Sequence, residues 1–436
     1  MCYIIVVENE EVSVMILSIR ANNYLVYSDE VELSLRADMK IKRMVTNTVP
    51  VGDLHVLKSV GIYGANNVGK TCLIQAIQSI KNVLLSFAAN VSSNLFTGDY
   101  VCSLGITFTE GERIFSYDFK FNSGRNNGIS PGFVYEKFSE RKVDVYGNES
   151  YTTIFLKDAI EQEYHFPEDP AVEELMKSIA VNNILIYTIN TEKYASVNEI
   201  KNILRRCAEK IEIIDLNNIP LEKTIQLLKD EKADKSKVVE LIKHADLDVE
   251  DYHYVKPDVV NLPVQPIQGV PQEVVLRAQT LATDMCCLMS NHRGKEVPSL
   301  VYDSTGTKKI AALASYIVEA LKEGKILVVD ELDSSLHFKL TRAIVSLFNN
   351  ELNNTGAQLI FTVHDITLLD CKKLFRKDQI WFAAKENGLA YLYSLDDFTA
   401  QDGVRAENDI AALYRKGVLG AVPEPDLISV MLKETK

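Results

Sequence analysis

The sequence has no long hydrophobic run: its 436 positions include no stretch of about 18 consecutive apolar residues. No membrane-spanning helix is therefore expected. The first residues carry the acids Glu8, Glu10 and Glu11 where a secretion signal would be basic. Met15 opens a strand-like segment and is a candidate for the natural start. These features predict a cytoplasmic protein.

Cysteines are few, and their spacing indicates no pairing. The seven are scattered, odd in number and never spaced as C-x-x-C, which favours free thiols in a reducing cytosol. Cys286 and Cys287 lie close to His292 and suggest a metal site, but cysteines buried in a helix are the more frequent case. The histidines show no metal-ligand spacing.

Positive charge is also scarce. The net charge of −13 argues against a generally basic nucleic-acid binder. Four basic residues at 201–210 could form a nucleic-acid face, but a solvated helix face is the more frequent reading. These four basic residues are Lys201, Arg205, Arg206 and Lys210. No heptad pattern is sustained, so a long coiled coil is not expected.

One stretch organises the rest of the chain. Residues 64–71 read G-x-x-x-x-G-K-T, between an apolar strand and an amphipathic helix, which is the context of a phosphate-binding P-loop. The glycines let backbone N–H groups turn towards phosphate oxygens, and the helix N-terminus adds its positive dipole end. Lys70 would reach the β- and γ-phosphates of ATP, and Thr71 would bind Mg²⁺. The expected nucleotide-binding residues here are Gly64, Asn66, Asn67, Gly69, Lys70 and Thr71.

A second apolar strand, at 325–329, ends in the carboxylates Asp330 and Glu331 and fits a Walker B motif. Asp330 would hold Mg²⁺, and Glu331 would act as the base for the attacking water. A third strand, at 358–363, ends at His364, where a γ-phosphate sensor would lie. Without the P-loop, a buried strand that meets a polar turn would explain the Walker B pattern equally well.

The segment 303–309 before this strand, Asp-Ser-Thr-Gly-Thr-Lys-Lys, opens a helix. Small, hydroxyl and glycine residues at a helix N-terminus can bind an anion. An ordinary helix cap explains the same residues and, for this segment alone, is the more frequent case. Asp303-x-x-Gly306 also matches one GTPase loop, but its distance from the P-loop is wrong and no Asn-Lys-x-Asp motif exists.

The order of elements predicts an α/β fold in several parts. Strand patterns at 100–145 indicate an antiparallel sheet beside the nucleotide domain. Helical patterns follow at 172–181, 197–210, 221–232 and 235–244, then a proline-rich linker at 254–271 and a helix at 272–289. About 260 positions separate Lys70 from Asp330, too many for a compact P-loop domain. We therefore expect a head formed by 1–150 and 301–436, split by a helical domain with its linker at 151–300.

These motifs in this order resemble the ATPase head of the ABC/SMC type. The resemblance implies that Ser304, Gly306 and Thr307 form a signature loop that binds the nucleotide of a second subunit, with His364 as the switch histidine. ATP and Mg²⁺ would be the cofactors, sandwiched in a homo-oligomer. The segments 15–35, 330–337 and 378–395 also resemble the AAA-annotated ATPases of bacterial phage-defence loci, which include AbiL and RloA, the ATPase part of OLD nucleases and the ATPase component of PARIS systems.

That second resemblance implies a sensor and scaffold ATPase of abortive infection, triggered by a phage protein, which controls a separate effector such as a toprim nuclease. Two departures argue for slow hydrolysis. The signature reads Ser-Thr-Gly-Thr rather than Leu-Ser-Gly-Gly-Gln, and no glutamine lies between Gln78 and Gln162 to attend the Mg²⁺; Glu136 is not assigned that role. The alternative is an SMC-like DNA repair or recombination ATPase, with DNA binding left open. A transporter ATPase fits poorly because of the signature and the large insertion.

Overall fold

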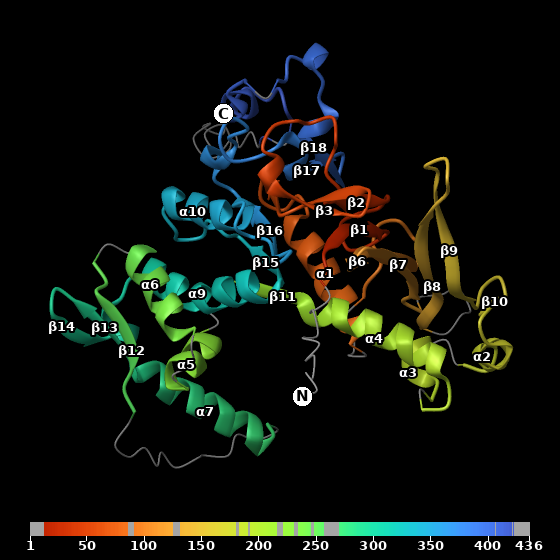
Figure 1. The fold of residues 1–436 in the computed structure, drawn as a ribbon, viewed down its shortest axis with the longest axis horizontal. Helices are drawn as coiled ribbons and strands as arrows, with labels where there is room; N and C mark the ends of the chain where they lie inside the picture. Colours follow the sequence, from red (N-terminus) through yellow and green to blue (C-terminus); the bar gives the residue numbers. More distant parts are fainter. Residues whose placement is uncertain are drawn as a thin grey trace, which may run out of the picture.

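The computed structural model is organised around a six-stranded sheet (Figure 1). Its order is β11-β15-β16-β5-β17-β18, parallel throughout except for the last, antiparallel pair. The strands are β5 (Ser59–Tyr63), β11 (Ile211–Asp215), β15 (Ile326–Asp330), β16 (Gln358–Val363), β17 (Ile380–Glu386) and β18 (Leu389–Ser394). The structure describes residues 13–85, 91–124, 131–179, 183–190, 192–215, 221–230, 234–245, 248–256, 270–405, 407–420 and 422.

Both faces of this sheet are buried, which explains its nearly continuous apolar strands. Along β15 the side chains alternate: Ile326 and Val328 belong to one core, Leu327 and Val329 to the other. Helices α1 (Lys70–Leu84) and α4 (Ala195–Lys210) contribute to the first core. Helices α9 (Thr305–Glu323) and α10 (Phe338–Asn349) contribute to the second. The strand that carries the P-loop is thus held rigidly between two layers.

A seven-stranded antiparallel sheet lies to one side, in the order β10-β9-β8-β7-β6-β1-β2. Helix α1 contacts β1 and β6, so the two sheets share the core around this helix. The antiparallel side sheet expected from the sequence is confirmed. Its strands are β1 (Ile16–Asn22), β2 (Val31–Ser34), β6 (Val101–Glu110), β7 (Arg113–Asn122), β8 (Gly132–Val143), β9 (Glu149–Asp158) and β10 (Glu163–His165). The hairpin of β3 (Thr48–Val51) and β4 (Leu54–Leu57) packs nearby on Met15 and Leu17.

The insertion forms a lobe, at the left of Figure 1, that packs on α9 and shares the second core. Besides helices it contains a three-stranded sheet in the order β12-β13-β14, which the sequence reading did not anticipate. The insertion comprises α5 (Glu222–Lys229), α6 (Lys235–Ala245), β12 (Asp251–Tyr254), α7 (Gln272–Cys286), β13 (Leu288–His292), β14 (Lys295–Pro298) and α8 (Ser299–Tyr302). Of the expected linker, 257–269 lies outside the described residues.

In the structure this insertion starts later than the expected residue 151. That position lies inside β9, which pairs with β8 in the side sheet. The chain then forms α2 (Pro170–Met176), α3 (Leu185–Thr188) and α4, and returns to the central sheet as β11. A five-residue strand on the sheet edge is too short for its pattern to stand out beside the helices. The lobe therefore begins only after β11.

Strands β17 and β18 form the antiparallel edge of the central sheet, and the last described helix is α11 (Ile410–Arg415). Within the described ranges, no helix combines the length and apolarity needed to span a membrane. The fold class expected from the sequence is confirmed: an α/β head with a P-loop, an antiparallel side sheet and an inserted lobe.

Candidate nucleotide site

The P-loop joins the end of β5 to the start of α1. Gly64 and Gly69 have positive φ values of 150° and 112°, and Asn67 has 63°. A Cβ atom at Gly64 would lie 2.3 Å from the carbonyl oxygen of Ala383 on β17, so only glycine fits there. Gly69 caps α1 without a side-chain hydrogen bond, which leaves the first N–H groups of the helix open to an anion.

Lys70 is buried, with 6% of its surface exposed. Its Nζ donates to the carbonyl oxygens of Gly64 and Ala65 at 2.8 and 2.7 Å. Burial lowers the pKa of the ammonium, and the nearby carboxylates of Asp330 and Glu331 partly oppose that shift. The lysine therefore lies along the loop, held by neutral carbonyl groups that a charged phosphate can replace as partners.

The Walker B aspartate is held by two threonines, one from the P-loop and one from β16. Thr71 Oγ1 donates to Asp330 Oδ2 at 2.9 Å, and Thr362 Oγ1 donates to Asp330 Oδ1 at 2.5 Å. Thr362 belongs to β16, which lies between β5 and β15 in the sheet. Thr362 was not predicted as a site residue. The sequence feature that could have indicated it is a hydroxyl residue in an apolar strand, two positions before His364.

Glu331 follows Asp330 with a left-handed backbone, at a φ of 52°. Its N–H donates to Thr362 Oγ1 at 2.7 Å, which fixes the turn. Its Oε1 lies 3.9 Å from Nε2 of His364, and both side chains are 38% exposed. A carboxylate beside an imidazole at the edge of the P-loop is a suitable pair to orient and deprotonate a water molecule.

These groups share one cavity of about 390 Å³. Of the predicted residues, its lining includes Asn66, Asn67, Gly69, Lys70, Thr71, Glu331 and His364, and it also includes Val26 and Cys72. Val26 and Tyr27 come from the turn between β1 and β2 of the side sheet, and Tyr27 OH donates to the Gly69 carbonyl at 2.9 Å. The structure therefore brings the P-loop, the Walker B carboxylates and the histidine together.

The loop after β15 is tied to the end of β16 by Asp333. Its Oδ2 accepts hydrogen bonds from the N–H groups of His364 and Asp365, at 3.0 and 2.7 Å. Its Oδ1 is buried and has no hydrogen-bond partner among the described residues. This link makes the position of the His364 backbone depend on the loop after β15.

The predicted signature residues lie elsewhere. Ser304 caps α9 and accepts a hydrogen bond from the N–H of Thr307 at 3.1 Å. A Cβ atom at Gly306 would lie 2.9 Å from the carbonyl oxygen of Ser335. Together with Ser335 and residues of α10, these residues line a second, more apolar hollow of about 670 Å³. The cap is present, and within one chain the signature residues do not line the P-loop cavity.

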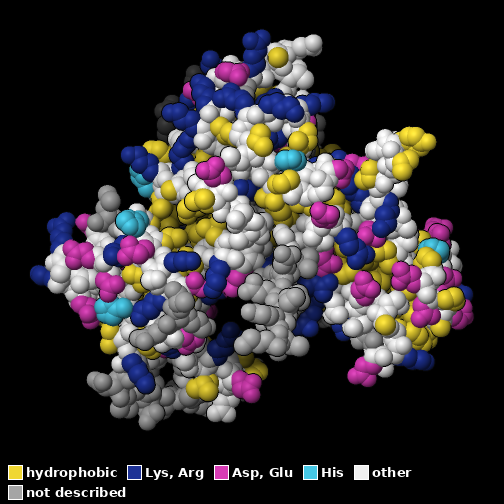
Figure 2. Space-filling view, in the orientation of Figure 1, with side chains coloured by type: hydrophobic (Ala, Val, Ile, Leu, Met, Phe, Trp, Pro, Cys, Tyr) yellow, Lys and Arg dark blue, Asp and Glu magenta, His cyan; other side chains and the backbone are white. Residues whose placement is uncertain are grey.

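The surface around this second hollow is partly hydrophobic. Figure 2 shows hydrophobic side chains around α10, where Phe338 is 42% and Leu347 is 41% exposed. Hydrophobic groups around a polar loop are typical of a surface that another protein covers.

The residues of the cavity fit a magnesium nucleotide. Mg²⁺ prefers oxygen ligands and usually binds through one or two carboxylates together with phosphate oxygens. Thr71 and Asp330 supply a hydroxyl and a carboxylate in contact with each other, beside the free N–H groups of the loop. Across the described ranges no three metal-ligating side chains cluster, so a metal here would need phosphate oxygens to complete its shell.

Glu136, to which no role at the Mg²⁺ is assigned, has its hydrogen-bond partners in and beside the side sheet and not in the nucleotide cavity. It is fully buried and accepts hydrogen bonds from Lys157 Nζ at 3.3 Å, from Tyr117 OH at 3.1 Å and from the Leu185 N–H at 3.0 Å. Burial raises the pKa of its carboxyl group, and Lys157 opposes that shift. Glu136 therefore connects β7, β8 and β9 to α3.

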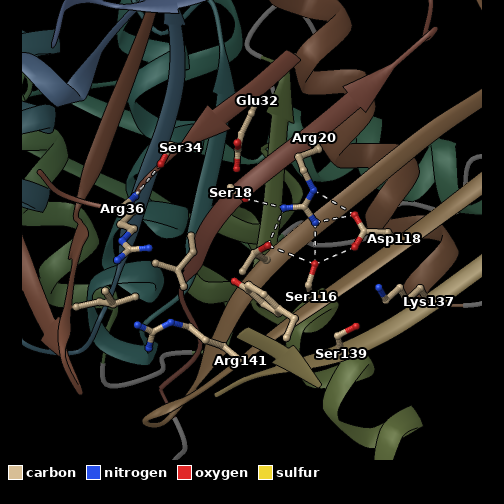
Figure 3. Close-up of a pocket in the computed structure, with 14 residues that line it drawn as sticks. Ser18, Arg20, Glu32, Ser34, Arg36, Ser116, Asp118, Lys137, Ser139 and Arg141 are labelled. Atoms are coloured by element: carbon tan, nitrogen blue, oxygen red, sulfur yellow. Dashed lines mark hydrogen bonds and ion pairs between the residues drawn. The ribbon is translucent and has the colours of Figure 1, made fainter. Parts of the chain in front are cut away.

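A further hollow of about 410 Å³ lies on the side sheet and contains several cations (Figure 3). Arg20 donates to both Asp118 Oδ1 and Ser116 Oγ, at 2.7 and 2.8 Å. Arg141 is paired with Asp53 and Glu149 at 2.7 and 3.0 Å. This hollow holds more arginines than the nucleotide cavity, but their charges are already matched by carboxylates.

Comparisons with known proteins find two kinds of similarity. Residues 201–370 match the family model described as "AAA domain, putative AbiEii toxin, Type IV TA system". That match contains the predicted signature residues as well as Asp330, Glu331 and His364, but not the P-loop. No curated protein sequence matches the chain.

Among solved structures, the SMC head domain from Thermotoga maritima is similar with a TM-score of 0.40 and 11% identity, over 87% of this chain and 98% of that one. The Smc head domain from Pyrococcus furiosus, bound to the C-terminal domain of ScpA, has a TM-score of 0.40 and 12% identity, over 89% and 98%. RecF with ATP has a TM-score of 0.37 and 14% identity, over 88% and 99%.

Proposed function

We propose that this chain binds and slowly hydrolyses ATP, and that it works as a homo-oligomer in which ATP is held between two copies. The observation that carries the proposal is the separation of the site into two parts. Lys70, Glu331 and His364 line one cavity, and the signature loop lines another. One chain thus offers the phosphate-binding half of a site and, on a different surface, a second loop with the chemistry to contact a nucleotide.

In this proposal each residue has one task. The N–H groups of the P-loop and Lys70 bind the phosphates, and Thr71 and Asp330 hold Mg²⁺. The metal supplies charge neutralisation at the phosphate oxygens. Glu331 accepts the proton of the attacking water, and His364 contacts the γ-phosphate side of the cavity. Ser304, Gly306 and Thr307 of a second copy would close the site and exclude bulk water.

We further propose that the ATPase is a sensor and scaffold in a bacterial anti-phage system, with a separate effector such as a nuclease. Support comes from the resemblance of residues 15–35, 330–337 and 378–395 to defence ATPases and from the AbiEii-type family match. A phage protein would act as the trigger. Slow hydrolysis suits a sensor. We expect slow hydrolysis because Glu136 is bound within the side sheet and supplies no substitute for the missing glutamine.

The alternative is a DNA repair ATPase like the SMC and RecF proteins among the similar structures. The basic residues of α4 give it little support. Arg205 is paired with Glu209 at 2.7 Å, Arg206 with Glu110, and Lys210 donates to the Glu323 carbonyl. A DNA affinity that stays nanomolar in rising salt, with ATP hydrolysis that follows DNA, would favour this alternative.

The experiment that tests the ATPase proposal compares Glu331→Gln with the parental chain. We expect the variant to bind ATP, to lose hydrolysis and to accumulate as a closed oligomer, because the base is removed and the phosphate contacts remain. Light scattering with and without ATP, together with phosphate release, gives both readouts. Hydrolysis at the parental rate would show that Glu331 is not the base.

A further inference from the structure

A buried carboxylate lies directly before the signature loop. The side chain of Asp303 has 0% exposure. Its Oδ1 accepts from Ser290 Oγ at 2.6 Å and lies 2.9 Å from Nε2 of His292, and its Oδ2 accepts from Ser299 Oγ at 2.6 Å. A buried carboxylate is tolerated when such partners replace water. Three close partners therefore fix the orientation of this side chain.

All three partners come from the inserted lobe, and Ser299 belongs to α8. Ser290 and His292 belong to β13, the central strand of the three-stranded sheet. Tyr252 on β12 lies within hydrogen-bond distance of Ser299 Oγ, at 2.6 Å, and extends the network to a second strand. Asp303 thus connects the sheet of the insertion to the polypeptide that enters α9.

The next residue belongs to the signature loop. Ser304 caps α9, and its side chain lies in the second hollow together with Gly306 and Thr307. Because neighbouring Cα atoms are a fixed distance apart, a shift of Asp303 moves Ser304 with it. The sheet of the insertion therefore has a direct mechanical connection to the loop.

We propose that Asp303 is a positioning residue for the signature loop, and that the β12-β13-β14 sheet sets, through it, how this loop engages the nucleotide on a second copy. The inference rests on the proposed ATP-bridged assembly and adds a control point to it. A partner that moves the inserted lobe would change hydrolysis at the P-loop of the other subunit without contacting either nucleotide site. Asp303 itself touches no reacting atom.

The test uses full-length chains with Asp303→Ala. We expect this variant to bind ATP through its own P-loop with unchanged affinity, because that cavity does not include the network. Hydrolysis should fall by about 100-fold, the loss typical of a contact displaced by about 1 Å. Ser290→Ala, which removes one donor from β13 and keeps the carboxylate, should reduce the rate less strongly.

Mixing experiments separate positioning from a general loss of structure. Lys70→Ala lacks a working P-loop but keeps its signature loop, so a mixed pair with Asp303→Ala has one complete site. The mixture should recover about a quarter of the parental rate when the chains pair at random. As a matched control, Asp251→Ala alters a half-exposed carboxylate on β12 outside the network and should hydrolyse ATP normally.

The outcomes distinguish this inference from the proposed function. Parental hydrolysis by Ser290→Ala and Asp303→Ala overturns the inference, and so does an Asp303→Ala loss that the Lys70→Ala chain does not restore. Should Asp303→Ala fail to fold, Ser290→Ala in the same mixture decides the matter. Failure of the ATPase proposal itself would appear separately, as a parental chain that releases no phosphate from ATP and does not assemble in its presence.

Discussion

The nucleotide cavity and the arginine-lined hollow of the side sheet differ in how their cations are held. In the first, one lysine donates to two carbonyl oxygens. In the second, Arg20 is engaged by the carboxylate of Asp118 and by hydroxyl groups (Figure 3), and Arg141 is paired with two carboxylates. A carbonyl is a weaker partner for a cation than a carboxylate, so Lys70 can exchange its partners for phosphate at low cost. Availability of the charge, more than the number of cations, indicates where an anion binds.

The largest expected effect tests which of the two sites binds ATP. Lys70→Ala should weaken ATP binding roughly 100-fold, about 2.7 kcal/mol, because a buried cation facing phosphate is lost. Arg20→Ala is the matched comparison and should leave ATP affinity unchanged. Binding of a fluorescent ATP analogue measures both. Equal losses in the two variants would mean that the side-sheet hollow also binds nucleotide.

A smaller effect is expected at Thr362. Thr362→Val keeps the shape of the side chain but removes the hydroxyl that joins Asp330 Oδ1 to the Glu331 N–H. We expect hydrolysis to fall by about 10- to 100-fold, as is typical when a group that orients a metal ligand is lost. Phosphate release under saturating ATP measures the change.

Thr341→Val is the control for this substitution. Thr341 is also fully buried, and its Oγ1 has no hydrogen-bond partner in the described part of the chain. Its replacement should leave the rate unchanged. A Thr362→Val chain that hydrolyses ATP as fast as Thr341→Val would remove Thr362 from the site.

Arg20→Ala itself should affect stability rather than binding. It leaves Asp118, Ser116 and Thr107 without the donor that they share, at a cost of about 2 kcal/mol. Urea denaturation followed by circular dichroism measures this cost. Arg205→Ala removes a largely exposed arginine that pairs with Glu209, and should change stability by less than about 0.5 kcal/mol. If Arg20→Ala destabilised the chain no more than Arg205→Ala, the Arg20 network would contribute little to stability.

The smallest expected effect concerns the side-sheet hollow, where carboxylates are paired with arginines. Arg36 and Arg141 lower the pKa of Glu149 from its ordinary 4.5 to about 2. Because the folded-state pKa is depressed, this group contributes stability above pH 4.5 that is lost as the pH falls towards 2. The melting temperature of the Glu149→Gln variant should therefore change less with pH between about 2 and 4.5 than that of the parental chain. Glu174→Gln, at a more exposed pair with Lys177, should leave the parental slope.

The motifs of the nucleotide cavity could be predicted because each spans a few neighbouring residues. The glycines at 64 and 69 are a local consequence of a tight turn, and the carboxylates at 330 and 331 mark the end of β15. Thr362 and Tyr27 could not be found in that way. Their roles depend on β16 lying between β5 and β15 and on the side sheet approaching the loop, and both are long-range contacts.

The fold shows the same division. Helices with clear periodicity, such as α4 before the lobe and α6 within it, appear where the sequence predicts them. The strands β11, β12, β13 and β14 contain only four or five residues each, too few for a reliable alternation. Their pairing partners decide their conformation, which is why the extent of the lobe and its small sheet were not foreseen.

The position of β5 in its sheet has a consequence for biosynthesis. Its neighbours are β16 and β17, so the strand that carries the P-loop has no partner until about 300 further residues have been made. The side sheet pairs β6 to β10 in sequence order and can form early. We expect a nascent chain that ends before residue 358 to have a folded side sheet and no ability to bind ATP. The nucleotide site would thus report that synthesis of the head is complete.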